Sequence, residues 1–469
     1  MSVKEVMTSL ADAVRGRYSV TNKLTVADMT DLINSENIDV AKLIDRSITK
    51  IEIPEGVTEI GKDAFRGCSQ LTEVTLPSTI TSIGENAFAD CPNLTIIDCS
   101  FNDDSVLGAP WGVDEVSVII SYNNSPLTFI AAEANSSVSL NIQFGNPTVS
   151  GLQYRTDVRS DWSYYPIGHT IQLDTVDSYV QFRNTNDDLN HFNDYSVFNM
   201  TGSIKATGSV QSLLNGSHEC KPSCFERLFM GCDSLLTAPK LTATTLAYSC
   251  YMDMFISCSI KEAPKLPATK LETYCYRDMF TACSHLIKAP ELPATSLAEY
   301  CHSGMFSQCT SLITAPKLPA TTLASHCYND MFWDCTKLTT APSLPSLTLK
   351  AKCYTHMFQG CTSLTAAPEL PATTLGEYCY EAMFYGCTSL ITAPELPATT
   401  LTTACYRSMF YGCTSLKSIR VAFTEWKELC TDDWMFDILT SGSFYKPSAL
   451  PEEHGIDRIP TNWTVVNKD

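Results

Sequence analysis

Several classes of protein are excluded by what this chain of 469 residues lacks. No stretch approaches the roughly 20 consecutive apolar residues that a membrane-spanning helix needs. No run of Lys or Arg supplies the basic stripe that neutralises phosphate backbones, and the formal net charge is −19. We therefore expect neither membrane insertion nor nucleic-acid binding.

Motifs of catalysis and of metal or cofactor binding are also missing. The chain has no GxSxG, HExxH, P-loop or dinucleotide fingerprint, and its eight histidines are scattered. The densest polar cluster could offer Asn186, Asp187 and Asp188 to Ca²⁺, but it lacks EF-hand spacing and is better interpreted as an ordinary loop. Residues 452–454, Glu-Glu-His, are a similar case. We expect no enzyme, no metal and no cofactor.

Neither end of the chain carries a sorting signal that we identify. The first twenty residues have no continuous apolar core followed by a small-residue cleavage site, and PTNWTVVNKD at the end is not a sorting tail. These features predict folding in a cytoplasm, where disulfides seldom persist. The 21 cysteines are therefore expected to be thiols.

Two patterns divide the first half of the chain. From about 46 to 120 the sequence repeats at a period of 23, as DAFRGCSQLTEVTLP is followed by NAFADCPNLTIIDCS. From about 123 to 215 there are short alternating runs such as SSVSLNIQF and SYVQFRNT, separated by Gly, Asn, Pro and Asp. Alternation of this kind predicts a β-sandwich.

A longer repeat dominates the second half. Pairs of cysteines in C-x7-C spacing recur eight times with a period of 26 that is broken once by 25, and their first members are Cys224, Cys250, Cys275, Cys301, Cys327, Cys353, Cys379 and Cys405. A fixed period over eight units predicts a solenoid in which each unit buries its apolar face against its neighbours. The last unit loses its AP-x-LP segment, so we expect the following residues to form a cap.

The nine-residue segment CYEAMFYGC, residues 379–387, predicts a short helix. At about 100° per residue Cys379, Tyr380, Met383, Phe384 and Cys387 fall on a single stripe, which we expect to face the core. The two cysteine Cα atoms would then lie about 12 Å apart, too far for a disulfide or for a shared zinc ion. Buried free thiols are the favoured interpretation. Bonds between equivalent cysteines of neighbouring repeats, and metal binding, remain the alternatives.

One position varies among otherwise near-identical repeats. The residue after the Ala-Pro pair is in turn Lys240, Lys265, Glu291, Lys317, Ser343, Glu369 and Glu395. A position that varies while its neighbours are constant is not held by the core, so we expect this column to be exposed. It is interpreted either as a solvated charge ladder or as a recognition surface on one face of the solenoid.

The repeats resemble a known family. DAFRGCSQLTEVTLPSTITSIGENAF resembles the BspA-type leucine-rich repeat, and CYEAMFYGCTSLITAPELPATTL is similar to a longer variant of it in surface proteins of Bacteroidetes and Firmicutes. The segments FNMTGSIKATGSVQSLL and KPSALPEEHGIDRIPTNWTVV resemble the domain that often precedes such repeats and their usual ending. The resemblance covers about 45 to 469. It implies an adhesin or other binding protein, without catalytic residues.

The opening of the chain has a different resemblance. Residues 2–15 and 25–34 predict two short helices, and ADAVRGRYSVTNKLTVADMTDLI resembles the N-terminal segment of phage and prophage tail proteins of gut bacteria. This resemblance implies that the segment docks to tail or capsid proteins, which would also bring a protein without an export signal to a cell surface.

Together these patterns predict an α+β multidomain fold with leucine-rich repeat solenoids on either side of a β-sandwich. The expected parts are a helical docking segment 1–44, short repeats 45–122, a β-sandwich 123–215, the main solenoid 216–416 and a cap 417–469. The expected function is a non-enzymatic virion fibre or receptor-binding protein, homo-oligomeric, that attaches to a host cell-surface glycan or protein. The alternatives are a capsid-decorating head fibre, a bacterial surface adhesin and a spacer that binds nothing.

Overall fold

The computed structural model describes residues 48–468 except 54–56, 100, 102–105, 107–108, 114–117, 122–124, 145–148, 157–159, 187–188, 190–194, 215–218 and 439. These residues form two compact units. The first ends at Leu127 and includes Thr207–Ser209, whereas the second comprises Thr128–Ala206 and the chain from Val210 onward. The expected docking segment 1–44 lies outside the described residues.

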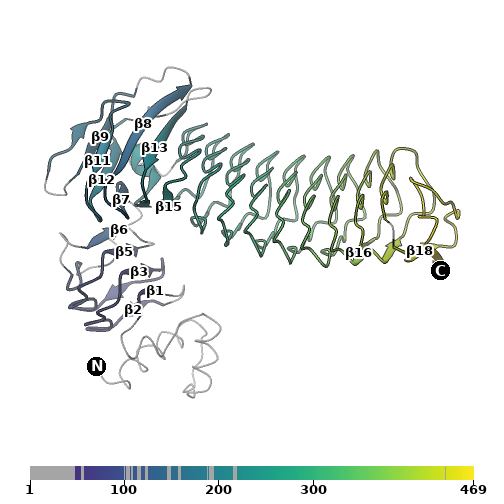
Figure 1. The fold of residues 1–469 in the computed structure, drawn as a ribbon, viewed down its shortest axis with the longest axis horizontal. Helices are drawn as coiled ribbons and strands as arrows, with labels where there is room; N and C mark the ends of the chain where they lie inside the picture. Colours follow the sequence, from purple (N-terminus) through teal and green to yellow (C-terminus); the bar gives the residue numbers. More distant parts are fainter. Residues whose placement is uncertain are drawn as a thin grey trace, which may run out of the picture. The chain divides into compact units, whose positions relative to one another are not determined.

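The expectation of an α+β fold is wrong. The described residues contain strands, turns and one short 3-10 helix, η1 (Val210–Leu214), but no α-helix. The predicted helices 2–15 and 25–34 lie outside the described part of the chain. The architecture is instead a β-solenoid of stacked coils, with a two-sheet domain at the start of the second unit (Figure 1).

The first unit is a short parallel solenoid. Its strands are β1 (Lys50–Glu52), β2 (Glu59–Ile60), β3 (Glu73–Leu76), β4 (Ser82–Ile83), β5 (Ile96–Cys99) and β6 (Ile119–Ser121). One sheet has the order β1-β3-β5-β6 and the other pairs β2 with β4. Val74 pairs with Ile97, a shift of one 23-residue period, so equivalent apolar residues stack in the core. The rings of Phe65 and Phe88 stack at 5.4 Å by the same rule.

The second unit opens with two packed antiparallel sheets. Their strands are β7 (Leu127–Ala131), β8 (Ser136–Phe144), β9 (Leu152–Arg155), β10 (Ser163–Tyr164), β11 (Ile171–Leu173), β12 (Tyr179–Asn184), β13 (Tyr195–Thr201) and β14 (Ile204–Thr207). The order β10-β9-β12-β7-β14 faces the order β11-β8-β13, and β15 (Leu235–Thr237) of the first repeat extends the former sheet by pairing parallel with β14. Between them Phe129, Phe182 and Phe198 contact one another edge to face, with centroids 4.8 to 5.9 Å apart.

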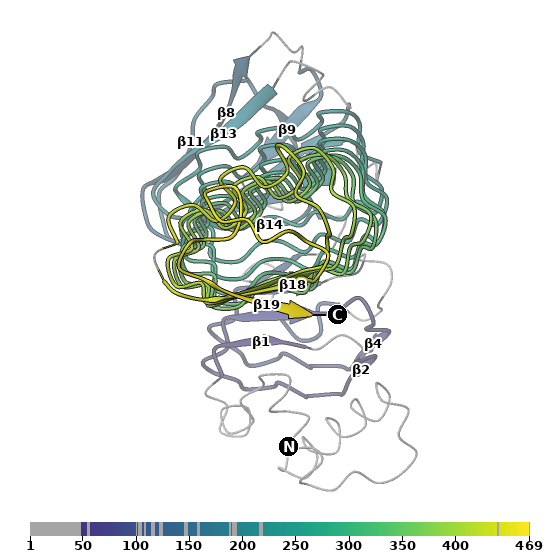
Figure 2. The same ribbon diagram turned by 90° about the vertical axis from the view of Figure 1, so that its right-hand side faces the viewer.

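The stacked rings join this domain to the repeat solenoid. Phe198 of β13 stacks on Phe229 of the first coil at 5.6 Å, and Phe229 stacks on Phe255 of the next coil at 5.3 Å. The apolar core therefore continues from the sheets into the coils. Figure 1 shows the coils side by side, and the end-on view of Figure 2 shows that they follow a common outline.

The sheet along the coils is sparse until the end of the chain. β15 (Leu235–Thr237) and β16 (Thr392–Leu396) are the strands within the repeats, and between them the coils are linked by isolated parallel bridges such as Thr314 to Thr340. Every repeat except the last has an Ala-Pro pair here, and proline has no amide hydrogen to donate to a ladder, so few regular strand pairs form. The regular sheet resumes with β17 (Ser418–Val421), β18 (Ser443–Pro447) and β19 (Thr464–Lys468).

The C-x7-C segments are successive four-residue turns rather than helices. In residues 379–387 alternate amides bond within a turn, as Met383 N–H does to Tyr380 O, while the others bond to the next coil, as Phe384 N–H does to Met409 O at 2.9 Å. Ala382 and Gly386 have positive φ of 49° and 70°, which the right-handed helix forbids. We call each such nine-residue stretch a turn segment.

The reason for the error is that both conformations bury the same positions. Every fourth residue of the segment has a left-handed backbone, and after each one the chain turns back toward the core. The side chains at offsets 0, 1, 4, 5 and 8 from the first cysteine therefore point inward, although the backbone is not helical. The coil-to-coil hydrogen bonds then replace those that a helix would have made internally.

Candidate binding surface

The cysteines of the turn segments have a definite structural role. Cys379, Tyr380, Met383, Phe384 and Cys387 are each at most 2% exposed. The second cysteine of each pair donates its S–H to the main-chain carbonyl of a phenylalanine in the preceding layer, which is β13 for Cys232 and the preceding coil for the others; Cys387 donates to Phe358 O at 3.1 Å. The same bond is made by Cys232, Cys258, Cys283, Cys309, Cys335, Cys361 and Cys413.

This hydrogen bond requires a protonated thiol. None of the 21 cysteines, all in the described part of the chain, forms a disulfide. Burial raises the pKa of Cys387 well above its ordinary value, because desolvation disfavours the thiolate. The sequence interpretation treated these thiols as small hydrophobes, and it missed that they are donors bonding one coil to the next.

Residues of the expected charged column lie on the outside of the coils. Lys240 is half-buried, whereas Lys265, Glu291, Lys317, Glu369 and Glu395 are exposed. The column continues into the C-terminal strands, where Arg420 Nη1 lies 3.9 Å from Glu395 and the Arg420 guanidinium lies 5.4 Å from the Tyr445 ring. Both interpretations of the column, a solvated charge ladder and a recognition surface, require exposed side chains, so this exposure does not distinguish them.

A second set of columns crosses the turn segments. The residue before the first cysteine gives a ladder in which Tyr274 stacks on Tyr300 at 4.8 Å and Tyr300 stacks on His326 at 4.2 Å. The residue after the central Met-Phe pair gives another ladder nearer the C-terminus. There Tyr385 stacks on Tyr411 at 4.5 Å, and Tyr411 stacks on Phe436 at 5.0 Å.

An open hollow lies where the second ladder ends. It has a volume of about 240 Å³ and is lined by His356, Gln359, Glu381, Ala382, Tyr385, Arg407 and Ser408 from three successive turn segments. Arg407 Nη1 lies 3.6 Å from Glu381 Oε1, and His356 Nδ1 lies 3.0 Å from Asp330 Oδ1. Tyr411 covers one face of the Tyr385 ring, which leaves the opposite face toward the coil of Gln359. We call these seven residues the hollow.

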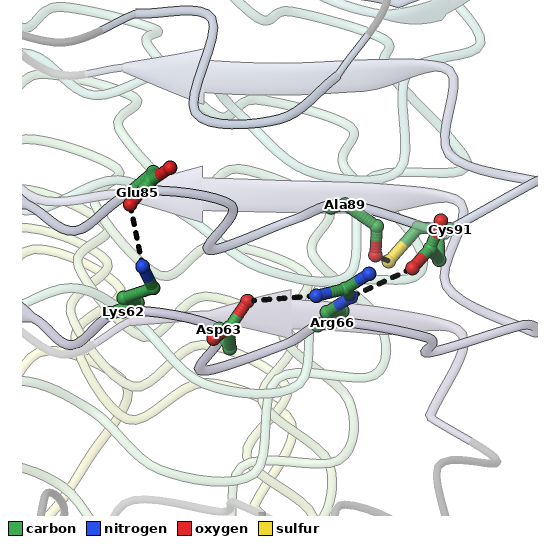
Figure 3. A network of polar contacts seen from close by, with 7 residues as sticks. Lys62, Asp63, Arg66, Glu85, Ala89 and Cys91 are labelled. Atoms are coloured by element: carbon green, nitrogen blue, oxygen red, sulfur yellow. Dashed lines mark hydrogen bonds and ion pairs between the residues drawn. The ribbon is translucent and has the colours of Figure 1, made fainter.

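The corresponding face of the first unit carries ion pairs instead. Arg66 lies 3.4 Å from Asp63 and 2.7 Å from Asp90, and Lys62 lies 2.6 Å from Glu85. Figure 3 shows Arg66 beside Asp63 and Lys62 beside Glu85. All five side chains are at least one-third exposed, so each pair contributes little to stability. We interpret them as links between adjacent coils.

Other polar clusters hold the fold together. Asn186 donates to Ser150 Oγ at 2.8 Å, while Asp187 and Asp188 lie outside the described residues. In the tail Glu453 accepts from Arg458 Nε at 3.0 Å, and His454 contacts Glu452 and Pro460 O, each at 3.3 Å. Over the described ranges, no group of three or more His, Cys, Asp or Glu side chains is placed to hold a metal ion. Within the same ranges we find no helix of the length and apolarity that crossing a bilayer demands.

Family comparison agrees with the geometry of the coils. A sequence model of the BspA type leucine rich repeat region matches residues 38–106 and 325–430, with six copies. Within these residues the repeats resemble the BspA type. The matches fall in the 23-residue repeats of the first unit and in the later 26-residue repeats of the second.

Solved structures show only distant likeness. A leucine-rich repeat protein of Bacteroides ovatus is 18% identical over 89% of this chain and 92% of its own, with a TM-score of 0.32. A leucine rich cell surface protein of Faecalibacterium prausnitzii is 16% identical over 80% and 79%, and the pneumococcal vaccine antigen PcpA is 14% identical over 90% and 79%, each with a TM-score of 0.26. These scores support no functional inference. No functionally curated protein matches the chain.

The hollow escaped the sequence interpretation although a signal was present. The position of Tyr385 follows an invariant Phe and is Thr281, Ser307, Trp333 and Gln359 in earlier repeats. Variation beside a constant core residue is the kind of signal that singled out the charged column, and it applies here too. The helical interpretation concealed the signal, because it placed Tyr385 and Glu381 on a solvated helix face.

Proposed function

We propose that this chain is a non-enzymatic adhesion protein, displayed at a bacterial surface, that binds a host or environmental glycan or protein through the outer columns of its solenoid. The observation that supports the proposal most is the contrast between columns. Over eight coils the inward positions are almost constant, while exposed positions change from coil to coil. A surface free to vary on a rigid, repetitive frame is suited to recognition.

Further support comes from the resemblance of the repeats. Residues 38–106 and 325–430 match the BspA type repeat, and that resemblance implies an adhesin or other binding protein. Many copies displayed on one cell would bind multivalently, so that weak individual contacts give strong attachment. Neither the repeats nor the hollow requires a cofactor for this role.

Charge reversal tests the charged column as part of the binding surface. We expect the variant Lys240→Glu, Lys265→Glu, Lys317→Glu to lower adsorption of the chain, coated on beads, to host epithelial cells. The control reverses three exposed lysines away from the column, Lys288, Lys337 and Lys350, by the same substitution. If both variants adsorb as well as the unmodified chain, the charged column does not contribute to binding. It is then a solvated charge ladder, as the spacer alternative requires.

A second candidate function rests on the opening sequence. Residues 1–44 resemble the N-terminal segment of phage tail proteins, and a virion fibre, at the tail or on the capsid, would use the same solenoid to reach a host receptor. Proteomic detection of the chain in purified virions would favour this function. Detection only on intact bacterial cells, by labelling with an impermeant reagent, would favour the surface adhesin.

A further inference from the structure

The hollow brings together the groups that recognise a polyhydroxylated ligand. Its lining offers a carboxylate from Glu381, a guanidinium from Arg407 and an amide from Gln359, together with the imidazole of His356 and the hydroxyl of Ser408. Acceptors and donors therefore converge on one volume. Hydrogen bonds from neutral hydroxyls to charged groups are stronger than bonds between neutral groups.

The Tyr385 ring supplies an apolar wall. The ladder Tyr385, Tyr411, Phe436 stacks ring on ring, and it ends at Tyr385 because the preceding coil has Gln359 in that position. Tyr411 covers one face of the Tyr385 ring, and Tyr385 also lines the hollow, so its side chain borders that volume together with Gln359. Tyr385 is thus the one large aromatic side chain among mainly polar lining residues, a composition that suits a hydroxyl-rich ligand better than an apolar one.

The charges of the hollow are balanced. Glu381 and Arg407 pair at 3.6 Å with side chains 18% and 51% exposed, and His356 contacts Asp330 at 3.0 Å. An anionic ligand would have to compete with Glu381 for Arg407, but a neutral hydroxyl can bridge both groups without separating them. The volume of about 240 Å³ is also below the roughly 300 Å³ at which drug-sized pockets begin, which suits a single ring.

We propose that the hollow is a subsite for one neutral hexopyranose unit of a glycan. The apolar face of the sugar packs against the Tyr385 side chain where it lines the hollow, and vicinal hydroxyls bond to Glu381 and Arg407. This assignment rests on the proposed adhesion function, and it places the recognition of sugar on the turn segments rather than on the charged column.

Binding of simple glycosides tests the subsite directly. The full chain is titrated by saturation-transfer NMR with the methyl glycosides of galactose, glucose, mannose and N-acetylglucosamine, and with N-acetylneuraminic acid as the acidic probe. We expect saturable binding of at least one neutral glycoside. Glu381→Gln should weaken it at least tenfold, and Tyr385→Gln should abolish it while leaving the fold intact, because the neighbouring coil carries glutamine at the same position.

Matched controls lie in the same repeats. Trp333→Gln removes an exposed aromatic side chain from the same column two coils away, and Glu377→Gln removes an exposed carboxylate from the coil of Tyr385; neither residue lines the hollow. Both controls should bind like the unmodified chain. The assignment is overturned if no neutral glycoside binds, if N-acetylneuraminic acid alone binds, or if Trp333→Gln weakens binding as much as Tyr385→Gln.

Cell adsorption separates this assignment from the adhesion function. If the unmodified chain adsorbs to cells but binds no neutral glycoside, the subsite fails and adhesion stands. If the glycoside binds with the expected variant pattern but the chain adsorbs to no cell, the subsite stands and the adhesion function fails.

Discussion

At the scale of single residues, the columns restrict what each position can contain. The ring after the first cysteine is tyrosine in most coils, and these rings stack at 5.8 to 5.9 Å. His302 interrupts the column between Tyr276 and Tyr328, stacked on each at 5.6 Å, and it is 1% exposed. Burial lowers the pKa of His302 to about 3, because the imidazolium would be desolvated without a counter-charge.

Acid sensitivity follows from this histidine. Between the unfolded pKa of about 6.5 and the folded value of about 3, the unfolded chain binds a proton that the folded chain rejects, so stability falls as pH falls. At pH 5 the cost is about 2 kcal/mol. We expect His302→Tyr, which restores the most frequent residue of the column, to remove this contribution of about 2 kcal/mol to the loss of stability at pH 5. Urea unfolding at pH 7 and pH 5 measures it, and an unchanged difference between the two pH values would contradict the buried neutral imidazole.

At the scale of the element, the turn segment depends on left-handed residues at every fourth position. One such column contains Gly231, Ser257, Ala282, Gln308, Asp334, Gly360, Gly386 and Gly412, all with positive φ. Another contains Asp253, Asp278, Gly304 and Asp330. Enrichment in Gly and Asp is the sequence signal for this backbone. The repeats show this enrichment, but the sequence interpretation relied on the apolar stripe, which also fits a helical period, and it therefore predicted a helix.

Gly231 provides a clean test of the left-handed column. Its φ is 72°, and a Cβ placed there would meet no atom within 4 Å, so steric crowding plays no part. We expect Gly231→Ala to lower the free energy of unfolding by about 1 kcal/mol, from the left-handed penalty alone. Gly231→Asn should cost less, since asparagine tolerates this region. Equal losses for both variants in urea denaturation would rule out backbone conformation as the cause.

At the scale of the whole molecule, the solenoid is a linear array in which each coil contacts its two neighbours. Its C-terminal end is closed by residues outside the repeat: Trp434 packs edge to face on Trp426 and Phe444, at 6.1 and 6.0 Å, and Phe423 lies 6.4 Å from Tyr406 of the last repeat. These rings cover the end of the apolar columns. In such an array stability is close to a sum of coil and interface contributions.

Removal of one whole coil should therefore be tolerated. Deleting residues 353–378 joins Lys352 to Cys379 and preserves every column, so we expect a folded, monodisperse chain with a modestly lowered unfolding midpoint. Deleting only residues 353–365, half a coil, brings exposed positions into core columns and should give aggregation. Size-exclusion chromatography with circular dichroism distinguishes the two results. Equal tolerance of both deletions would contradict in-register stacking.

The sequence alone was sufficient for the repeat periods and for the solenoid, because burying the same stripe in every unit needs an equivalent stripe on each neighbour. It did not determine the backbone of the turn segment. A stripe at offsets 0, 1, 4, 5 and 8 fits both a helix and successive turns, and the choice depends on whether amides bond within the segment or to the next coil.

The tertiary structure also decided what the stacked positions form together. Cys387 is a thiol donor because Phe358 O of another coil lies 3.1 Å away. Likewise, the hollow exists because Tyr385, Glu381 and Arg407 come from coils that lie side by side. The sequence of one repeat predicts which of its residues are buried. It does not give their distances to residues of other repeats, because those distances are set by the stacking of the folded coils.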